Sequence, residues 1–182
     1  SEDHYGASLI LGGAEGSLWD LSGMYASLAR MLSHYRSYNG RYDRSDIHPL
    51  TTYPIEEKKP IRSVTDIRLA DESLLSYASL WFMFEAMSGL NRPEEEADWQ
   101  QFSSMKQVAW KTGTSYGGRD AWAIGVTPRY VVGVWVGNAT GEGRSGLTGV
   151  GYAAPILFDI YSLLPDVPWF DQPYDELEEV AV

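Results

Sequence analysis

The chain has 182 residues, enough for one domain with a hydrophobic core, and 44% of them are hydrophobic, as in ordinary globular proteins. Its formal net charge of −11 argues against direct binding to nucleic acid or to an anionic membrane surface. Cysteine is absent, which excludes disulfides and thiolate chemistry. His4, His34 and His48 have no metal-ligand spacing, so we expect neither a metal nor a cofactor.

The first expected element is a helix that begins after Ser17. Apolar residues recur every three or four positions over residues 18–35, which is the period of one helix face. Ser17 is a typical N-cap, with Asp20 three residues later. The helix should end between Ser33 and Arg36. Residues 41–66 are polar and contain three prolines, so they predict a loop with short extended pieces.

A second helix is expected over residues 71–90, beginning at Asp71. Residues 81–84 make it apolar on nearly all sides, so it should be buried. Pro93 follows its end. The acidic run after it, residues 94–98, reads as solvated surface.

The pattern changes to strands after residue 106. Three apolar runs, residues 108–112, 121–126 and 130–137, read as consecutive strands, and the short link at residues 127–129 makes the last two an antiparallel hairpin. A final helix is expected over residues 153–164, with Pro155 in its first turn. This order predicts an α+β fold with helices packed on an antiparallel sheet.

The acidic, proline-containing stretch 166–182 is expected to be a linker or tail outside a unit formed by residues 1–165. The chain starts at Ser1 without a methionine, so we expect it to be a piece of a longer protein.

Lys111-Thr112-Gly113 lies on the first expected strand, which reads as an edge strand, and Thr114 follows it. Lys-Thr-Gly is one of three elements shared by penicillin-binding proteins and serine β-lactamases. Alone it is weak, but residues 9–15, 119–128, 134–138 and 153–155 also fit. Together they resemble the bifunctional (class A) penicillin-binding proteins over residues 5–165, and most of all their 1C group.

The resemblance implies the C-terminal part of a transpeptidase domain with the fold of penicillin-binding proteins and serine β-lactamases. Lys111 would supply positive potential near the terminal carboxylate of an acyl-D-alanyl-D-alanine stem peptide. Thr112 and Thr114 would offer hydroxyls to that carboxylate, and Gly113 would let the substrate backbone lie close. The N–H of Thr114 would be one of two oxyanion donors.

The whole protein would cross-link peptidoglycan stem peptides through an acyl-serine intermediate and bind β-lactams. It would be anchored in the inner membrane, face the periplasm and carry a glycosyltransferase domain upstream.

Two matches to the family's other elements are rejected. Residues 103–106 spell Ser-x-x-Lys, but the family's nucleophile begins a helix far upstream of Lys-Thr-Gly. Residues 37–39 spell Ser-x-Asn, but they follow the segment that this element should precede. The family's Ser-x-x-Lys and Ser-x-Asn elements are therefore expected N-terminal to Ser1. This remainder of the transpeptidase domain is expected to be a binding partner of the chain. The chain alone should be inactive.

Three other interpretations remain. Residues 141–146 spell G-x-G-x-x-G, but no strand follows the next helix, so a flexible loop is favoured over a dinucleotide site. A serine β-lactamase-like hydrolase would be excluded by an upstream glycosyltransferase domain. A non-catalytic binding module that keeps the fold would be favoured if the parent protein lacked Ser-x-x-Lys.

Overall fold

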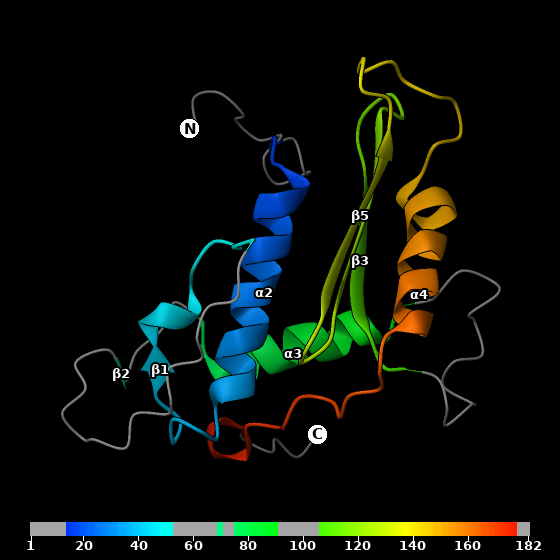
Figure 1. The fold of residues 1–182 in the computed structure, drawn as a ribbon. Coiled ribbons are helices and arrows are strands. Elements are labelled where there is room, and N and C mark those ends of the chain that lie inside the picture. Colours follow the sequence, from blue (N-terminus) through cyan, green and yellow to red (C-terminus); the bar gives the residue numbers. More distant parts are fainter. Residues whose placement is uncertain (1–13, 53–68, 71–74, 91–105, 178–182) are drawn as a thin grey trace, which may run out of the picture.

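A three-stranded antiparallel sheet lies at the centre of the chain, with a helix against each face (Figure 1). The structure is a computed structural model that describes residues 14–52, 69–70, 75–90 and 106–177. Strand order is β3-β4-β5, so the three strands are consecutive, as the sequence predicts. The main elements are α2 (Leu18–His34), α3 (Tyr77–Ser88), β3 (Ala109–Thr114), β4 (Asp120–Val126), β5 (Val131–Gly137) and α4 (Ala154–Leu163).

Short elements complete the described part. The strands β1 (Tyr42–Asp43) and β2 (Leu69–Ala70) pair antiparallel, which gives the short extended pieces expected there. Single turns are formed by η2 (Arg44–Asp46), by the π-turn η4 (Gly149–Ala153) and by η5 (Tyr174–Glu176). Together these elements confirm the predicted α+β class.

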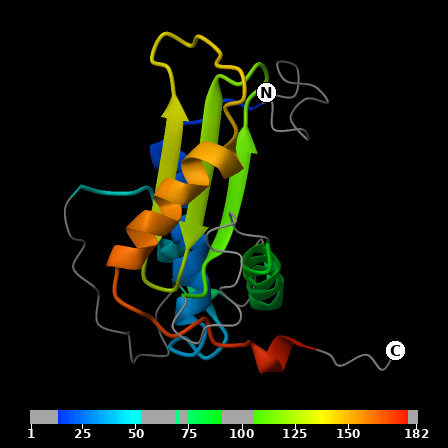
Figure 2. The same ribbon diagram turned by 90° about the vertical axis from the view of Figure 1, so that its right-hand side faces the viewer.

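The alternation of side chains along the strands divides the interior into two hydrophobic clusters. Figure 2 looks onto α4, with the sheet behind it and α2 on the far side. Ala109 and Ile124 belong to the cluster under α2 and α3. Trp110 and Ala123, one position away on the same strands, belong to the cluster under α4. Both faces of the sheet are therefore covered along its lower part.

Helix α2 begins where the sequence predicts. The hydroxyl of Ser17 accepts a hydrogen bond from the backbone N–H of Asp20 at 3.0 Å, which satisfies a free amide of the first turn. The helix crosses the sheet at Gly133, where an added Cβ would lie 2.9 Å from Leu18 Cδ1. A larger residue at position 133 would push the start of α2 away from the sheet.

The prediction for the second helix was wrong in two respects. Leu75 and Ser76 are not helical; α3 starts at Tyr77, and Ser76 is its N-cap, whose hydroxyl accepts from Ser79 N–H at 3.1 Å. The expected start at Asp71 lies outside the described residues. Nor is α3 buried all round, because Phe82 is 56% exposed. Because the sequence of this helix is apolar on nearly all sides, it did not indicate which face would be buried.

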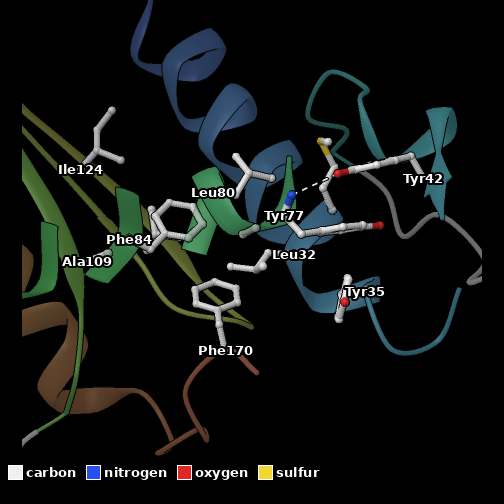
Figure 3. Close-up of a cluster of buried hydrophobic side chains, with 12 residues drawn as sticks. Leu32, Tyr35, Tyr42, Tyr77, Leu80, Phe84, Ala109, Ile124 and Phe170 are labelled. Atoms are coloured by element: carbon white, nitrogen blue, oxygen red, sulfur yellow. Dashed lines mark hydrogen bonds between the residues drawn. The ribbon is translucent and has the colours of Figure 1, made fainter. Parts of the chain in front are cut away.

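Three tyrosines join α3 to the end of α2 and to β1 (Figure 3). Tyr42 stacks on Tyr77, with ring centroids 4.3 Å apart, and its hydroxyl accepts from the Tyr77 backbone N–H at 3.0 Å. Tyr35 meets the same ring edge-on at 4.6 Å. Burial raises the pKa of Tyr77 well above 10, so its hydroxyl stays protonated and donates to the carbonyl of Arg41.

Residues 165–177 cross beneath the sheet from α4 towards the end of α2 (Figure 1). Phe170 is 6% exposed and stacks on Phe84 of α3 with centroids 5.0 Å apart. Trp169 donates its indole N–H to Glu85, and Glu176 accepts from the N–H of Ala78 at 3.1 Å. The sequence suggested a linker or tail from residue 166, but these described residues are packed on the core. The domain boundary at residue 165 stays a prediction.

Candidate functional site

Lys111, Thr112, Gly113 and Thr114 form the upper part of β3, the outer strand of the three that the structure describes (Figure 2). Only β4 pairs with β3 there, in a register that sets Lys111 opposite Ile124 and Thr114 opposite Ala121. The other edge of β3 has no strand beside it among the described residues. An open edge presents backbone N–H and C=O groups to any extended chain that approaches it.

The backbone of Thr114 faces this open edge. The next residue, Ser115, donates its N–H to the carbonyl of Asp120 across the hairpin at 2.9 Å, so the Ser115 N–H points towards the β4 side. Successive backbone groups of a strand point to opposite edges. The N–H and C=O of Thr114, and those of Thr112, therefore point away from β4.

The ammonium of Lys111 lies close to the same edge. Its Nζ donates to the carbonyl oxygen of Thr112 at 2.7 Å, and the residue is exposed. An exposed cation beside outward-facing amides makes this edge locally positive on a chain of net charge −11.

Alternation along β3 splits the motif between two faces. Lys111 and Gly113 share the α2 face with Ala109, whereas Thr112 and Thr114 share the α4 face with Trp110. The structure therefore brings all four predicted residues to one strand edge. The side chain of Lys111 leaves this edge on the α2 face of the sheet, and the hydroxyls of Thr112 and Thr114 leave it on the α4 face.

The start of η4 holds the hydroxyl side of the motif in place. Gly149 donates its N–H to Thr114 Oγ1 at 3.0 Å. A Cβ at position 149 would lie 2.7 Å from the carbonyl oxygen of Gly113 and 2.8 Å from Thr112 Cβ, so only glycine fits this approach. The Thr114 hydroxyl accepts this bond and keeps its own proton to donate. The sequence carries no signal for this contact, because no local pattern links residues 35 positions apart.

The described residues of the two rejected matches lie away from the motif. Lys106 Nζ donates to the carbonyls of Tyr161 at 2.7 Å and Leu164 at the end of α4, on the opposite side of the domain from Lys111's face. Ser103 lies outside the described residues. Residues 37–39 form a turn beyond the C-terminus of α2, at the lower end of the molecule in Figure 1.

The glycine-rich residues 141–146 form an exposed loop, in agreement with the preferred interpretation. Arg144 N–H donates to the carbonyl of Gly118 at 2.9 Å, so the loop lies against the turn between β3 and β4. Its backbone packs on the hairpin that carries the motif.

Comparison with known proteins finds a similar sequence among the penicillin-binding proteins. Over 157 residues the chain is 32% identical to penicillin-binding protein 1C of Escherichia coli strain K12. Over most of its length the chain is therefore similar to a penicillin-binding protein. The aligned part makes up 86% of this chain and 17% of that relative. The predicted resemblance to the 1C group is thereby confirmed.

No protein-family model matches the chain, and no solved structure matches it either. Within the described ranges, no helix has both the length and the apolar character needed to cross a membrane. The chain spans only 17% of the length of the penicillin-binding protein 1C sequence.

Proposed function

We propose that this chain contributes the Lys-Thr-Gly strand to the active site of a peptidoglycan D,D-transpeptidase. The transpeptidase would be part of a bifunctional class A penicillin-binding protein. The observation that carries the proposal is the open edge of β3, where Lys111 Nζ and the outward-facing N–H of Thr114 lie together in a relative of penicillin-binding protein 1C. On this view, the domain has the fold of penicillin-binding proteins and serine β-lactamases.

The substrate would bind as an extra strand. An extended stem peptide lies along the open edge and pairs with the backbone of Thr112 and Thr114. Lys111 and the threonine hydroxyls attract its terminal carboxylate through charge-assisted hydrogen bonds. The N–H of Thr114 donates to the oxygen that becomes negative when the penultimate carbonyl is attacked. Such a donor contributes on the order of 3 kcal/mol to the acyl-transfer step.

The attacking serine and its Ser-x-Asn partner would come from the part of the domain N-terminal to Ser1. The serine acquires the acyl group, D-alanine leaves, and an amine of a neighbouring peptidoglycan strand takes the acyl group. A β-lactam acylates the same serine. We therefore expect the isolated chain to be inactive. The whole protein would be anchored to the inner membrane, face the periplasm and include a glycosyltransferase domain.

Labelling with fluorescent penicillin tests the proposal. The full-length protein should be labelled, and this 182-residue chain should not. In the full-length protein, Lys111→Ala should lower the acylation rate roughly 100-fold or more, because it removes the cation at the carboxylate and near the serine hydroxyls. Since Lys111 is exposed, the fold should persist.

The matched control is Arg129→Ala, which removes an exposed cation from the β4–β5 turn at the other end of the sheet and should leave the acylation rate unchanged. An unchanged rate in Lys111→Ala would remove this residue from the site. Covalent labelling of Ser103 or Ser37 would overturn the assignment of the nucleophile to the missing part. Rapid turnover of the penicillin would favour a β-lactamase-like hydrolase.

A further inference from the structure

The start of α4 meets the Lys-Thr-Gly strand on the α4 face of the sheet. The turn η4 leads directly into α4, and in Figure 2 this end of the helix lies beside the upper part of β3. The N-cap of η4 is Thr148, and its first residue is Gly149. Both follow Leu147, which is 5% exposed inside the cluster under α4. The packing of Leu147 therefore brings the start of η4 to the motif.

Gly149 lies directly against the backbone of the motif. A Cβ at position 149 would lie 2.6 Å from the carbonyl oxygen of Trp122 and 2.7 Å from that of Gly113. Trp122 and Gly113 are paired across β4 and β3. The backbone of η4 therefore rests on the sheet at the middle of the motif, and any side chain at position 149 would push it away.

This close approach lets Gly149 direct the hydroxyl of Thr114. The N–H of Gly149 donates to Thr114 Oγ1 at 3.0 Å. A threonine hydroxyl has one proton and two lone pairs, so an accepted bond fixes the χ1 rotamer and leaves the proton for another acceptor. A hydroxyl that accepts a hydrogen bond is also a stronger donor, because linked hydrogen bonds polarise one another. The Thr114 hydroxyl is thus prepared to donate to an anion.

Thr148 holds Gly149 in this orientation. The Thr148 hydroxyl accepts from the N–H of Gly151 at 3.1 Å, and its carbonyl oxygen accepts from the N–H of Tyr152 at 3.0 Å, so the first turn of η4 closes on this residue. Loss of an N-cap hydroxyl loosens the first turn of a helix, and here it would loosen the direction of the Gly149 N–H. Thr148 is exposed, so a substitution there leaves the buried Leu147 in place.

We propose that Thr148 and Gly149 are positioning residues, which hold the Thr114 hydroxyl as a donor to the terminal carboxylate of the substrate. This inference rests on the proposed function, in which Thr114 binds that carboxylate. It adds that the start of α4, 35 positions further along the chain, sets how strongly the hydroxyl binds it. Hydrogen bonds to a charged acceptor are roughly twice as strong as neutral ones, so the effect falls on a free carboxylate and much less on its neutral ester.

The test compares benzylpenicillin with its methyl ester, which lacks the negative charge, on the full-length protein. Competition with fluorescent penicillin gives the acylation rate constant for each compound, and the ratio of the two rate constants measures recognition of the carboxylate. Thr148→Val removes the cap at nearly constant volume and should lower this ratio about fivefold or more, through the benzylpenicillin rate. Thr148→Ser keeps the hydroxyl and should retain the wild-type ratio. Gly149→Ala forces η4 off the sheet and should lower the ratio at least as much as Thr148→Val.

The matched control is Thr127→Val, at the opposite end of the sheet. Thr127 Oγ1 likewise accepts from a backbone N–H, that of Tyr130 at 3.0 Å, and Thr127 is 3% exposed. The control therefore loses an equivalent bond away from the motif, and its ratio should equal that of the wild type. If Thr148→Val also keeps the wild-type ratio, even with both rates lowered, the start of α4 only supports the fold and the inference is wrong.

Two further outcomes separate this inference from the proposed function. Thr114→Val removes the hydroxyl itself and should lower the ratio at least as far as Thr148→Val. An unchanged ratio in Thr114→Val would remove this hydroxyl from the proposed carboxylate site and overturn the inference with it. If fluorescent penicillin fails to label the wild-type protein, the proposed function itself is wrong.

Discussion

His34 illustrates what a single polar contact does in this fold. Its Nδ1 lies 2.9 Å from Asp46 Oδ1, and Asp46 is 5% exposed. Arg30 donates to the carbonyl oxygens of Asp46 and His48 at 3.0 and 3.2 Å, so the segment after β1 is held against α2. The hydrogen bond to Asp46 raises the pKa of His34 above 6.5, while burial opposes the rise and the charges of Asp46 and Asp43 add to it.

A pH dependence of stability follows from this pair. Because the pKa of His34 is raised in the folded state, its stabilising contribution is complete below pH 6.5, the ordinary value, and is lost as pH rises through the folded-state pKa. His34→Asn keeps a donor near Nδ1 but cannot titrate. In urea unfolding from pH 5.5 to 8.5, the stability advantage of the wild type over His34→Asn should shrink as pH rises.

The control for that series is His48→Asn, because His48 Nδ1 lies 2.7 Å from the carbonyl oxygen of Pro49 rather than beside Asp46. It should retain the wild-type pH dependence. A constant difference between wild type and His34→Asn across the range would show that the ion pair with Asp46 does not form in solution.

At the scale of elements, Lys106 ties the entry of β3 to the end of α4. Its ammonium donates to the carbonyls of Tyr161 and Leu164 and lies 3.5 Å from Asp166 Oδ1, and its side chain is only 22% exposed. A cation at a helix C-terminus satisfies free carbonyls and offsets the helix dipole. This contact helps to fix the strand that carries Lys111 against α4.

Lys106→Met should therefore lower the free energy of unfolding by about 1–3 kcal/mol, because charged hydrogen bonds to partly buried carbonyls are lost while the side-chain volume is kept. Chemical denaturation of the 182-residue chain measures the change. Asp166→Asn removes only the ion pair between Lys106 and the Asp166 side chain, which is 77% exposed. It should lower the free energy of unfolding by less than about 1 kcal/mol. Equal effects of the two substitutions would mean that Lys106 acts through the surface ion pair alone.

For the whole molecule, the C-terminal segment acts as a strap across the base. Phe170 stacks on Phe84 inside the cluster beneath α2 and α3, and Pro173 is fully buried. Arg36 pairs with Asp171 at 3.2 Å, and the hydroxyl of Tyr35 donates to Asp175 at 3.3 Å. These contacts join α2 and α3 to a segment that follows α4.

Phe170→Ala should destabilise the chain by about 3 kcal/mol, since it removes a buried ring and leaves a cavity beside Phe84. Thermal or urea unfolding would record this loss. Leu163→Ala, on a side chain that is 85% exposed at the end of α4, is the matched control and should change stability by less than about 0.5 kcal/mol. A negligible effect at Phe170 would show that the segment does not pack in solution.

The sequence alone determined the elements whose signals are local. Ser17 and the apolar period predicted α2, the short link at residues 127–129 predicted the β4–β5 hairpin, and Lys111-Thr112-Gly113 on an edge strand predicted the candidate site. These features depend on neighbouring residues, whose spacing a sequence displays directly.

Tertiary structure alone decided the features that join distant residues. The Gly149 contact with Thr114, the cap that Lys106 supplies to α4 and the packing of Phe170 on Phe84 each link positions more than 30 residues apart. Such contacts leave no period in the sequence. The start of α3 also depended on context, because the sequence predicted a start at Asp71 whereas the N-cap of the helix is Ser76.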